Sequence, residues 1–213
     1  MVQIIKNEPT FFIDVKKKVK SSHFISSAWY ELGKDEKGFK TKLREYILLE
    51  EQNMLCAYCE QEIESDEKSS NTDHFKKRDW CARETLEYNN LLVSCKNEFH
   101  CENIKDKFKF THCSEFDKMI NPVIETPDDF FDYGIGGDIL LKEGLNQIDK
   151  ERAEFTIMVF ALDNSSLKKD RAKIGDSLSF YHSDDYGIDD ILSEINSHPS
   201  FIKNIYRKIG ELK

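Results

Sequence analysis

Hydrophobic and polar positions follow different periods along the chain, and together they predict a mixed α+β protein. Over residues 38–53, apolar residues recur every three or four positions among charged ones, as in an amphipathic helix. Residues 91–94, Leu-Leu-Val-Ser, form a short apolar run that is typical of a strand. A charged segment with helical character follows over residues 101–110. Residues 1–34 mix short apolar pieces with lysines and show no readable period.

The second half of the chain predicts short strands between turns, followed by helices. Turns are expected at residues 121–122, Asn-Pro, and at residues 134–138, Gly-Ile-Gly-Gly-Asp. Helices are expected over 151–162, over 167–177 behind an N-cap at Asn164, and over 188–197, ahead of Pro199 and a basic tail. No internal repeat or linker interrupts this order.

The composition fits an ordinary folded protein. With 213 residues, 39% of them hydrophobic, and only 9 Gly and 4 Pro, the chain has enough apolar material for one or two cores. No apolar run approaches the roughly 20 residues of a membrane span, so we expect a soluble protein without a signal peptide. Six cysteines fit a reducing cytoplasm, where thiols are free to bind metal and are not expected to form disulfides.

The charge distribution limits how the protein could hold nucleic acid. The formal net charge is −9, and residues 121–200 contain 17 Asp and Glu against 7 Lys and Arg. Proteins that hold nucleic acid by bulk electrostatics usually carry a net basic surface. The basic clusters are Lys76, Lys77 and Arg78, and Lys105, Lys107 and Lys109. They could touch phosphates or could simply be solvated faces, so we expect substrate capture to depend on a partner.

Four of the six cysteines have the spacing of a structural zinc site. Cys56 and Cys59 form C-x2-C, and Cys95 and Cys101 form a second pair after 35 intervening residues. A two-residue gap lets a tight turn direct both sulfurs at one ion, and four thiolates suit tetrahedral Zn2+. Two alternatives stay open. A lone C-x2-C turn can be redox-active, and His100 beside Cys101 could complete a site of three cysteines and one histidine.

The remaining cysteines, Cys81 and Cys113, fit neither pair. Their spacing matches no metal-binding turn, and we expect both to be ordinary thiols. The neighbouring His112 leaves a minor alternative, in which His112 and Cys113 contact a stray metal ion.

Residues suited to phosphodiester hydrolysis lie between the two cysteine pairs. Asp73 precedes His74, and Asn90 follows sixteen residues after the histidine. This chemistry needs a hard-metal ligand, a general base with a pKa near neutrality, and a group that fixes the tautomer of the base. Carboxylate and carbonyl oxygens suit Mg2+ or Mn2+ while thiolates suit Zn2+, so one module could carry both. A lone histidine is more often a satisfied structural group, so the hypothesis depends on this context.

Four stretches of the chain form a recognisable set. They are 55–60 (LCAYCE), 73–75 (DHF), 86–95 (LEYNNLLVSC) and 101–108 (CENIKDKF). Together they resemble the HNH endonuclease superfamily and, within it, the PtuB family of HNH subunits in Septu-type anti-phage defence systems, which also accompany some retrons. The similarity extends to residues 8–9, the helix before Cys56, residues 120–122 and residues 156–171, and so covers most of the chain.

The resemblance implies an α+β fold class with a ββα-metal (HNH) module, in which a β-hairpin and a helix hold a catalytic cation, and a zinc-binding site of four cysteines. Mainly helical N- and C-terminal segments would flank the module. The expected parts are an N-terminal helical segment, 1–54, the HNH nuclease module, 55–112, and a C-terminal mainly helical region, 113–213, packed on the module.

The resemblance also implies roles for the motif residues. His74 would activate water, Asp73 would bind the cation, and Asn90 would orient the histidine. Relatives usually carry His or Asn directly after the last cysteine, whereas Glu102 stands there in this sequence and Asn103 follows it. Either could be the third ligand of Mg2+ or Mn2+, and we favour Glu102.

Basic residues near these motifs are expected to bind the substrate. Lys105, four residues after Cys101, fits a phosphate contact at this end of the predicted helix. Lys76 and Lys77, just after the Asp-His pair, are expected to add further phosphate contacts.

The sequence therefore predicts a metal-dependent phosphodiesterase, an HNH endonuclease acting in antiviral defence. Its partners would be nucleic acid and, as the resemblance implies, an ABC-type ATPase, PtuA. DNA is the favoured substrate, and RNA such as tRNA stays possible because general-base hydrolysis with one metal does not distinguish the two. A different class of function is a non-catalytic zinc module for assembly or nucleic-acid binding, with His74 as a core residue.

Overall fold

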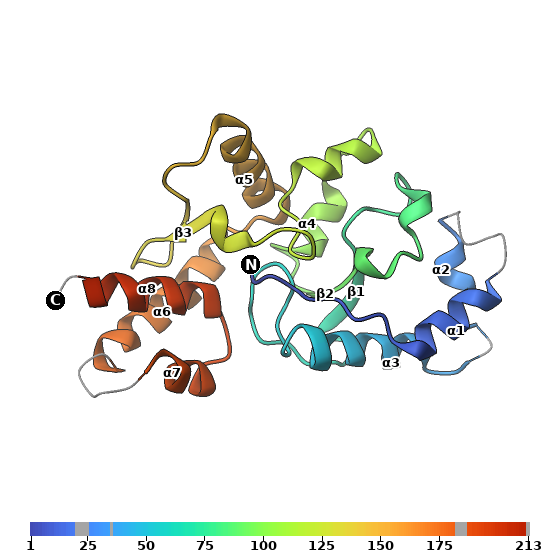
Figure 1. Ribbon diagram of the computed structural model, residues 1–213, viewed down its shortest axis with the longest axis horizontal. Helices are drawn as coiled ribbons and strands as arrows, with labels where there is room; N and C mark the ends of the chain where they lie inside the picture. The colour runs from blue at the N-terminus through green and yellow to red at the C-terminus, as the bar shows by residue number, and fades with distance from the viewer. Residues whose placement is uncertain (20–25, 35, 182–186, 212–213) are drawn as a thin grey trace.

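The computed structural model describes residues 1–19, 26–34, 36–181 and 187–211. Figure 1 shows an elongated molecule, with a small sheet and its neighbours in the middle and helices at both ends. The α-helices are α1 (Thr10–Lys18), α2 (Ala28–Glu31), α3 (Phe39–Tyr46), α4 (Glu102–Lys107), α5 (Gln147–Phe160), α6 (Ser165–Tyr181), α7 (Ile188–Glu194) and α8 (Pro199–Glu211). The strands are β1 (Ser70–His74), β2 (Leu91–Cys95), β3 (Phe131–Tyr133) and β4 (Ile139–Leu141). Short helical turns are η2 (Ile47–Glu51), η3 (Ala82–Glu84), η4 (Tyr88–Asn90), η5 (Cys113–Lys118) and η6 (Pro127–Asp129).

The amphipathic helix predicted over 38–53 is confirmed as α3, which continues into the π-helical turn η2. Phe39, Leu43 and Ile47 are buried at four-residue intervals, so one face of the helix packs against the core. Gln52, just after η2, is also buried. Its amide accepts from the Val93 N–H at 2.8 Å and donates to the Val93 carbonyl at 2.8 Å, so the end of this helix is fixed to β2.

The central sheet is an antiparallel pair of strands, β1 and β2, in which Ser70 faces Cys95 and His74 faces Leu91. The predicted strand at 91–94 is confirmed, since β2 is buried along its whole length. The predicted helical segment after Cys101 is confirmed as the short helix α4. In this order of strand, strand and helix, β2 ends at Cys95, and α4 begins with the acidic residue Glu102 directly after Cys101.

The C-terminal part contains the second strand pair, β3 and β4, and the helices α5 to α8. The tight turn between β3 and β4 needs Gly137, because its φ is +84° and a Cβ there would lie 2.1 Å from the Lys168 carbonyl oxygen. Asn164 caps α6 as predicted, since its Oδ1 accepts from the Ser166 N–H at 2.9 Å. The basic segment predicted after Pro199 is helical, since residues 199–211 form α8, whose apolar side is buried.

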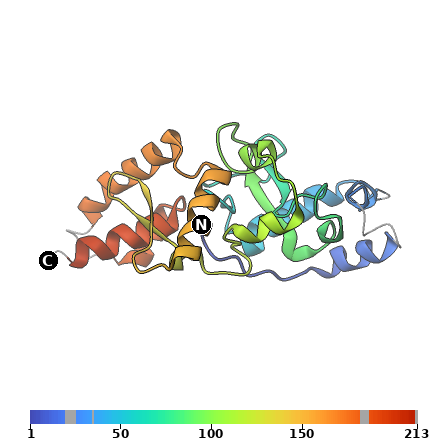
Figure 2. The same ribbon diagram turned by 90° about the horizontal axis from the view of Figure 1, so that it is seen from above.

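The start of α8 is held by the turn that carries Cys56 and Cys59. Glu60, directly after Cys59, is buried, and its carbonyl accepts from the His198 N–H at 2.7 Å. Its carboxylate accepts from the Ser200 N–H at 2.8 Å, at the start of α8. Figure 2, seen from above, shows α8 and α6 extending from this central region to one end, and α1 to the other.

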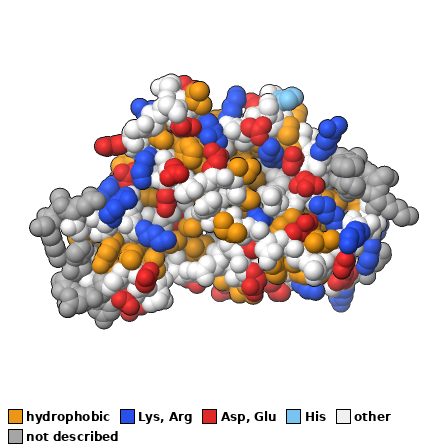
Figure 3. Space-filling model, in the orientation of Figure 1, with side chains coloured by type: hydrophobic (Ala, Val, Ile, Leu, Met, Phe, Trp, Pro, Cys, Tyr) orange, Lys and Arg blue, Asp and Glu red, His pale blue; other side chains and the backbone are white. Residues whose placement is uncertain are grey.

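The surface carries mixed charge. Figure 3 shows one face, on which basic and acidic side chains are interspersed. Among the described residues, none of the helices combines the length and the apolar character that a membrane span requires.

Candidate functional site

The four cysteines of the two predicted pairs converge into one buried group. Their sulfurs all lie within 4.8 Å of one another. The Sγ atoms of Cys56 and Cys101 are 3.7 Å apart, and those of Cys59 and Cys95 are 3.9 Å apart. Four sulfurs at about 2.3 Å from a tetrahedral Zn2+ would be about 3.8 Å from each other. The spacing of the sulfurs therefore fits one zinc ion.

Backbone geometry explains how these distant cysteines meet. The first pair lies on a turn that ends at Glu60, whose φ of 63° is in the left-handed region and reverses the chain after Cys59. Cys95 ends β2, and its N–H donates to the Cys56 Sγ at 3.3 Å. Cys101 is the N-cap of α4 with a φ of 60°. The long gap between the pairs is taken up by the loop and strands that return the chain to the same point.

The buried thiols of this group differ in pKa. Burial raises the pKa of Cys59 and of Cys101, whereas hydrogen bonds from the other cysteines lower the pKa of Cys95. A bound divalent cation favours the thiolate form of every ligand. His100 lies nearby, with Nδ1 3.2 Å from the Cys101 Sγ, but the four mutually close ligand atoms are the four sulfurs. The arrangement thus favours four cysteine ligands over the alternative of three cysteines and one histidine.

A polar cavity of about 380 Å³ lies along β1, all of whose residues line it. Its lining includes Asp73, His74, Lys77, Glu102 and Lys105 from the predicted site. Further lining residues are Trp29, Lys40, Arg44, Glu67, Ser70, Asn71, Thr72, Arg78, Asp79, Lys96 and Asp106. The sequence-predicted residues from β1 and α4 are therefore brought together in one hollow.

Asp73 is buried and fully engaged by neighbouring side chains. Its Oδ1 accepts from the Lys105 ammonium at 2.6 Å, and its Oδ2 accepts from the Tyr58 hydroxyl at 2.5 Å. Burial raises the pKa of Asp73 while the charge of Lys105 lowers it. Tyr58 lies inside the C-x2-C turn, so its side chain connects the cysteine group to Asp73, which lines the cavity.

His74 ends β1 with its imidazole packed edge-on against Trp29, at 4.8 Å between ring centres. Its Nε2 lies 2.9 Å from the Thr85 carbonyl oxygen, which fixes Nε2 as the protonated nitrogen of the neutral ring. Burial lowers the pKa of His74 to about 3, and the nearby charges of Arg78 and Lys105 act in the same direction. The imidazole is therefore neutral at pH 7, with Nδ1 as its acceptor.

Asn90 holds the loop after β1. Its Oδ1 accepts from the Lys76 N–H at 2.7 Å, and its Nδ2 donates to the carbonyls of Lys76 and Glu84 at 3.1 and 3.0 Å. Its own carbonyl accepts from the Phe75 N–H at 2.9 Å. The contact that orients the imidazole thus comes from Thr85, and the amide of Asn90 fixes the loop that carries Thr85 and the basic residues.

The two candidate third ligands point in different directions. Glu102 lines the cavity, and its Oε1 accepts from the Asn71 amide at 2.7 Å. Burial and the negative charge of Asp73 raise the pKa of Glu102 to about 8. The amide of Asn103 instead donates to the Asn97 carbonyl at 2.9 Å, outside the cavity lining. The helix register therefore presents Glu102, and not Asn103, to the side chain of Asp73.

The three predicted phosphate-binding lysines already have protein partners. Lys105 is fully buried, and its ammonium donates to Asp73 and, at 2.6 Å, to the His74 carbonyl, so it does not take the predicted phosphate-contacting position. Lys76 pairs with Asp117 at 2.8 Å, outside the cavity lining. Lys77 lines the cavity and donates to the Asp106 carbonyl at 2.7 Å.

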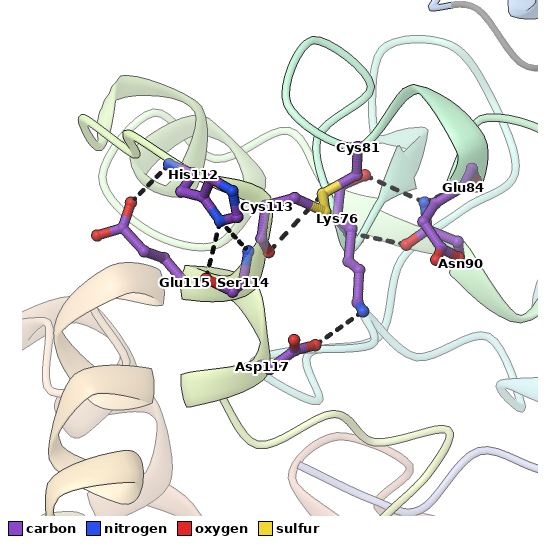
Figure 4. The surroundings of a disulfide bond; sticks show 9 residues. All are labelled: Lys76, Cys81, Glu84, Asn90, His112, Cys113, Ser114, Glu115 and Asp117. Atoms are coloured by element: carbon purple, nitrogen blue, oxygen red, sulfur yellow. Dashed lines mark hydrogen bonds and ion pairs between the residues drawn. A yellow bond between two sulfur atoms is a disulfide. The ribbon is translucent and has the colours of Figure 1, made fainter.

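The expectation that Cys81 and Cys113 are free thiols is wrong, because they form a disulfide with their Cα atoms 5.3 Å apart (Figure 4). The bond joins the loop after β1 to the turn η5, which packs against it although 32 residues separate the cysteines. Nor does His112 contact a metal with Cys113. Its Nδ1 lies 2.9 Å from the Ser114 hydroxyl and caps η5. Sequence spacing carries no signal of this pairing.

The chain is a mixed α/β protein with small two-stranded sheets, and its buried four-cysteine group could hold a metal ion such as zinc. Over 112 residues, 48% of its length, the chain is 32% identical to the Septu protein PtuB of Bacillus thuringiensis. The match spans 41% of that relative. It shows a PtuB-like relationship for this part of the chain, as the motifs predicted. No family model matches the chain, and the HNH assignment stays a prediction.

Proposed function

We propose that the protein is a metal-dependent HNH endonuclease, the effector nuclease of a Septu-type anti-phage defence complex. The observation that carries the proposal is the convergence of Asp73, His74 and Glu102 on one cavity, joined through Tyr58 to a buried four-cysteine group. The order of β1, β2 and α4 is the order expected of a ββα-metal module. The nuclease module would be residues 55–112, flanked by the segments 1–54 and 113–213.

In this proposal His74 accepts a proton from the water that attacks phosphorus. Its Nδ1 is the available acceptor, because Nε2 faces the Thr85 carbonyl. The cations of Arg78 and Lys105 oppose protonation of the ring in the free protein. A bound phosphate would offset these positive charges and so favour proton transfer to His74.

Asp73 and Glu102 supply the oxygen atoms for the catalytic cation. A bound Mg2+ or Mn2+ would neutralise the charge that develops on the phosphate and on the leaving 3′ oxygen. The negative charge of Asp73 raises the pKa of Glu102, and two carboxylates this close together suit such a hard cation. Lys105 balances Asp73 in this structure, and Asn103 is retained as the alternative third ligand.

The four cysteines would hold structural zinc. The sulfur spacings of 3.7 and 3.9 Å support this assignment. Because Cys101 is the N-cap of α4 and Cys95 ends β2, the zinc would fix the helix that carries Glu102 to the strand that pairs with β1. The structural ion would thereby position the catalytic carboxylates.

The similarity to a Septu protein supports a role in anti-phage defence and, with it, an ABC-type ATPase partner, PtuA. The net charge of −9 supports capture of nucleic acid by a complex more than by this chain alone. We therefore expect the isolated protein to bind nucleic acid weakly at physiological salt.

The test is cleavage of plasmid DNA and of tRNA by purified protein, with and without PtuA, in Mg2+, Mn2+ or EDTA. We expect cleavage that requires metal and disappears in His74→Ala protein with an unchanged zinc content. Cleavage by His74→Ala at the wild-type rate would overturn the mechanism. A zinc-containing complex that cleaves neither substrate would favour the non-catalytic zinc module.

A further inference from the structure

Two cations in the cavity have no acidic partner among the described residues. Lys40, from α3, and Arg78, from the loop after β1, both line the cavity with His74. Neither forms an ion pair with a carboxylate in that part of the chain. Nη1 of Arg78 is buried without a hydrogen-bond partner there. Burial and the charge of Arg78 lower the pKa of Lys40. Neighbouring cations without a counterion indicate a site for an anion.

Aromatic rings, and not carboxylates, hold these cations. The Lys40 ammonium lies 5.0 Å from the ring centre of Trp29 and 5.7 Å from that of Tyr30. The Arg78 guanidinium lies 5.1 Å from the ring centre of Tyr30. A ring face positions a cation without cancelling its charge, so both charges remain available to a ligand. Trp29 also touches His74, which places the cations beside the candidate general base.

The two aromatic residues differ in exposure. Trp29 is buried between Lys40 and His74, whereas the Tyr30 side chain is 66% exposed. Single strands of nucleic acid are held by cations that track the backbone and by aromatic rings on which bases stack. Bases inside a duplex stack on one another and present no free face to such a ring. The exposed ring beside unneutralised cations therefore suits an unpaired nucleotide.

We propose that Lys40, Arg78 and Tyr30 form a binding site for an unpaired nucleotide, whose phosphate contacts the two cations and whose base stacks on Tyr30. This inference rests on the proposed nuclease function and adds a substrate class, a strand that is unpaired next to the cleaved bond. Lys40 and Tyr30 come from the N-terminal segment, so substrate selection is shared between that segment and the nuclease module.

The test measures binding without cleavage. Full-length protein carrying His74→Ala, with zinc but without Mg2+, is titrated into fluorescein-labelled single-stranded DNA, single-stranded RNA and blunt duplex DNA, and anisotropy is recorded over a salt series from about 50 mM upwards. Lys40→Ala should weaken single-strand binding about tenfold and reduce the slope of log affinity against log salt by about 0.7, the loss of one phosphate contact. Lys40→Met, which keeps the apolar stem over Trp29, should give the same result.

Lys42→Ala is the matched control. Lys42 lies on the same helix, with its ammonium 4.4 Å from the ring centre of Phe11 and outside the cavity lining. This variant should keep both the affinity and the salt slope. Tyr30→Ala should weaken single-strand binding about tenfold with an unchanged salt slope and leave duplex binding unchanged, whereas Tyr30→Phe should bind as the parent does.

Three outcomes would overturn the inference. The first is an equal change in single-strand affinity for Lys40→Ala and Lys42→Ala. The second is a loss of duplex affinity in Tyr30→Ala equal to its loss of single-strand affinity. The third is single-strand binding too weak to measure at the lowest salt. Zinc content and unfolding temperature, matched across the variants, separate loss of contact from loss of fold. The expected binding pattern in a protein that never cleaves would remove the proposed function and leave this site in place. Metal-dependent cleavage by the wild-type protein, together with unaltered binding by the variants, would support the proposed function and rule out this nucleotide site.

Discussion

The two ends of the β1–β2 strand pair deal with buried charge in different ways. At one end Cys95 leads into four sulfurs, which as thiolates would need a cation from outside the chain. At the other end the chain supplies its own cation, because Lys105 lies 2.6 Å from Asp73. If the four cysteines hold a metal ion, as we propose, the cysteine end would depend on that ion for its stability, whereas the cavity end has a cation of its own. We therefore expect a permanent ion at the first and an exchangeable ion at the second.

The largest expected effect comes from emptying the cysteine end. Cys59→Ser, or removal of zinc with a strong chelator, should unfold the module with a loss on the order of several kcal/mol, because the binding free energy of a structural metal ion adds directly to the stability of the fold. Elemental analysis and thermal unfolding measure this. Cys113→Ser, which alters a cysteine outside the group, should keep one zinc per chain. Equal zinc in Cys59→Ser and wild type would show that the four-cysteine assignment is wrong.

The next effect comes from removing the internal cation of the cavity end. Lys105→Met leaves Asp73 buried without its partner, which should destabilise the fold by about 3–5 kcal/mol. Added Mn2+ should restore part of this loss and raise the unfolding temperature more in the variant than in wild type. Lys107→Met, at an exposed position on the same helix, is the control. A variant as stable as wild type would contradict the idea that Lys105 neutralises the site.

Breaking the disulfide should affect the cavity end alone. Cys81→Ser or reduction of the bond frees the loop that carries Thr85 and Arg78 from η5, with an expected cost of about 2–4 kcal/mol. Zinc content should not change, because the four-cysteine group shares no residue with this bond. Calorimetry under reducing and non-reducing conditions, with zinc analysis of the same samples, makes the measurement. Zinc loss on reduction of this bond alone would show that the two ends are coupled.

The smallest effect separates the two candidate ligands at the cavity end. Glu102→Ala should raise the Mg2+ concentration needed for half-maximal cleavage about tenfold, which corresponds to about 1.4 kcal/mol. Asn103→Ala should leave that concentration unchanged, because its amide binds the Asn97 carbonyl. If instead Asn103→Ala loses the metal response and Glu102→Ala keeps it, Asn103 is the ligand.

Sequence periods predicted elements that are amphipathic by themselves and missed those defined by their neighbours. The helix around α3 was predictable because its buried residues recur at four-residue intervals, and β2 because it begins with the apolar run Leu-Leu-Val. The polar strand β1, Ser-Asn-Thr-Asp-His, is extended because it pairs with β2, which its own sequence does not reveal. The helix α8 is amphipathic as well, since Ile202, Ile205 and Ile209 recur at three- and four-residue intervals, and its period was readable although no helix was predicted there.

Candidate site residues could be identified from the sequence where they form short local motifs. The cysteine pairs and the Asp73-His74 dipeptide are local patterns. In the structure the four cysteines form one group, and Asp73 and His74 line the cavity. Contacts between residues distant in the chain were not predictable. Tyr58 lies inside the C-x2-C motif, and nothing in the sequence links it to Asp73. Thr85 binds His74 through its backbone carbonyl, which every residue type possesses.

The contact between Glu60 and the start of α8 makes the C-terminal helices a reporter of metal loading. Glu60 follows a zinc-type ligand directly, and its carboxylate and carbonyl hold the backbone at Ser200 and His198. If the four cysteines hold a metal ion, loss of that ion would loosen this turn. The first residues of α8 would then lose Glu60 as their hydrogen-bond acceptor. The order at the start of α8 would therefore report whether the four cysteines hold a metal ion.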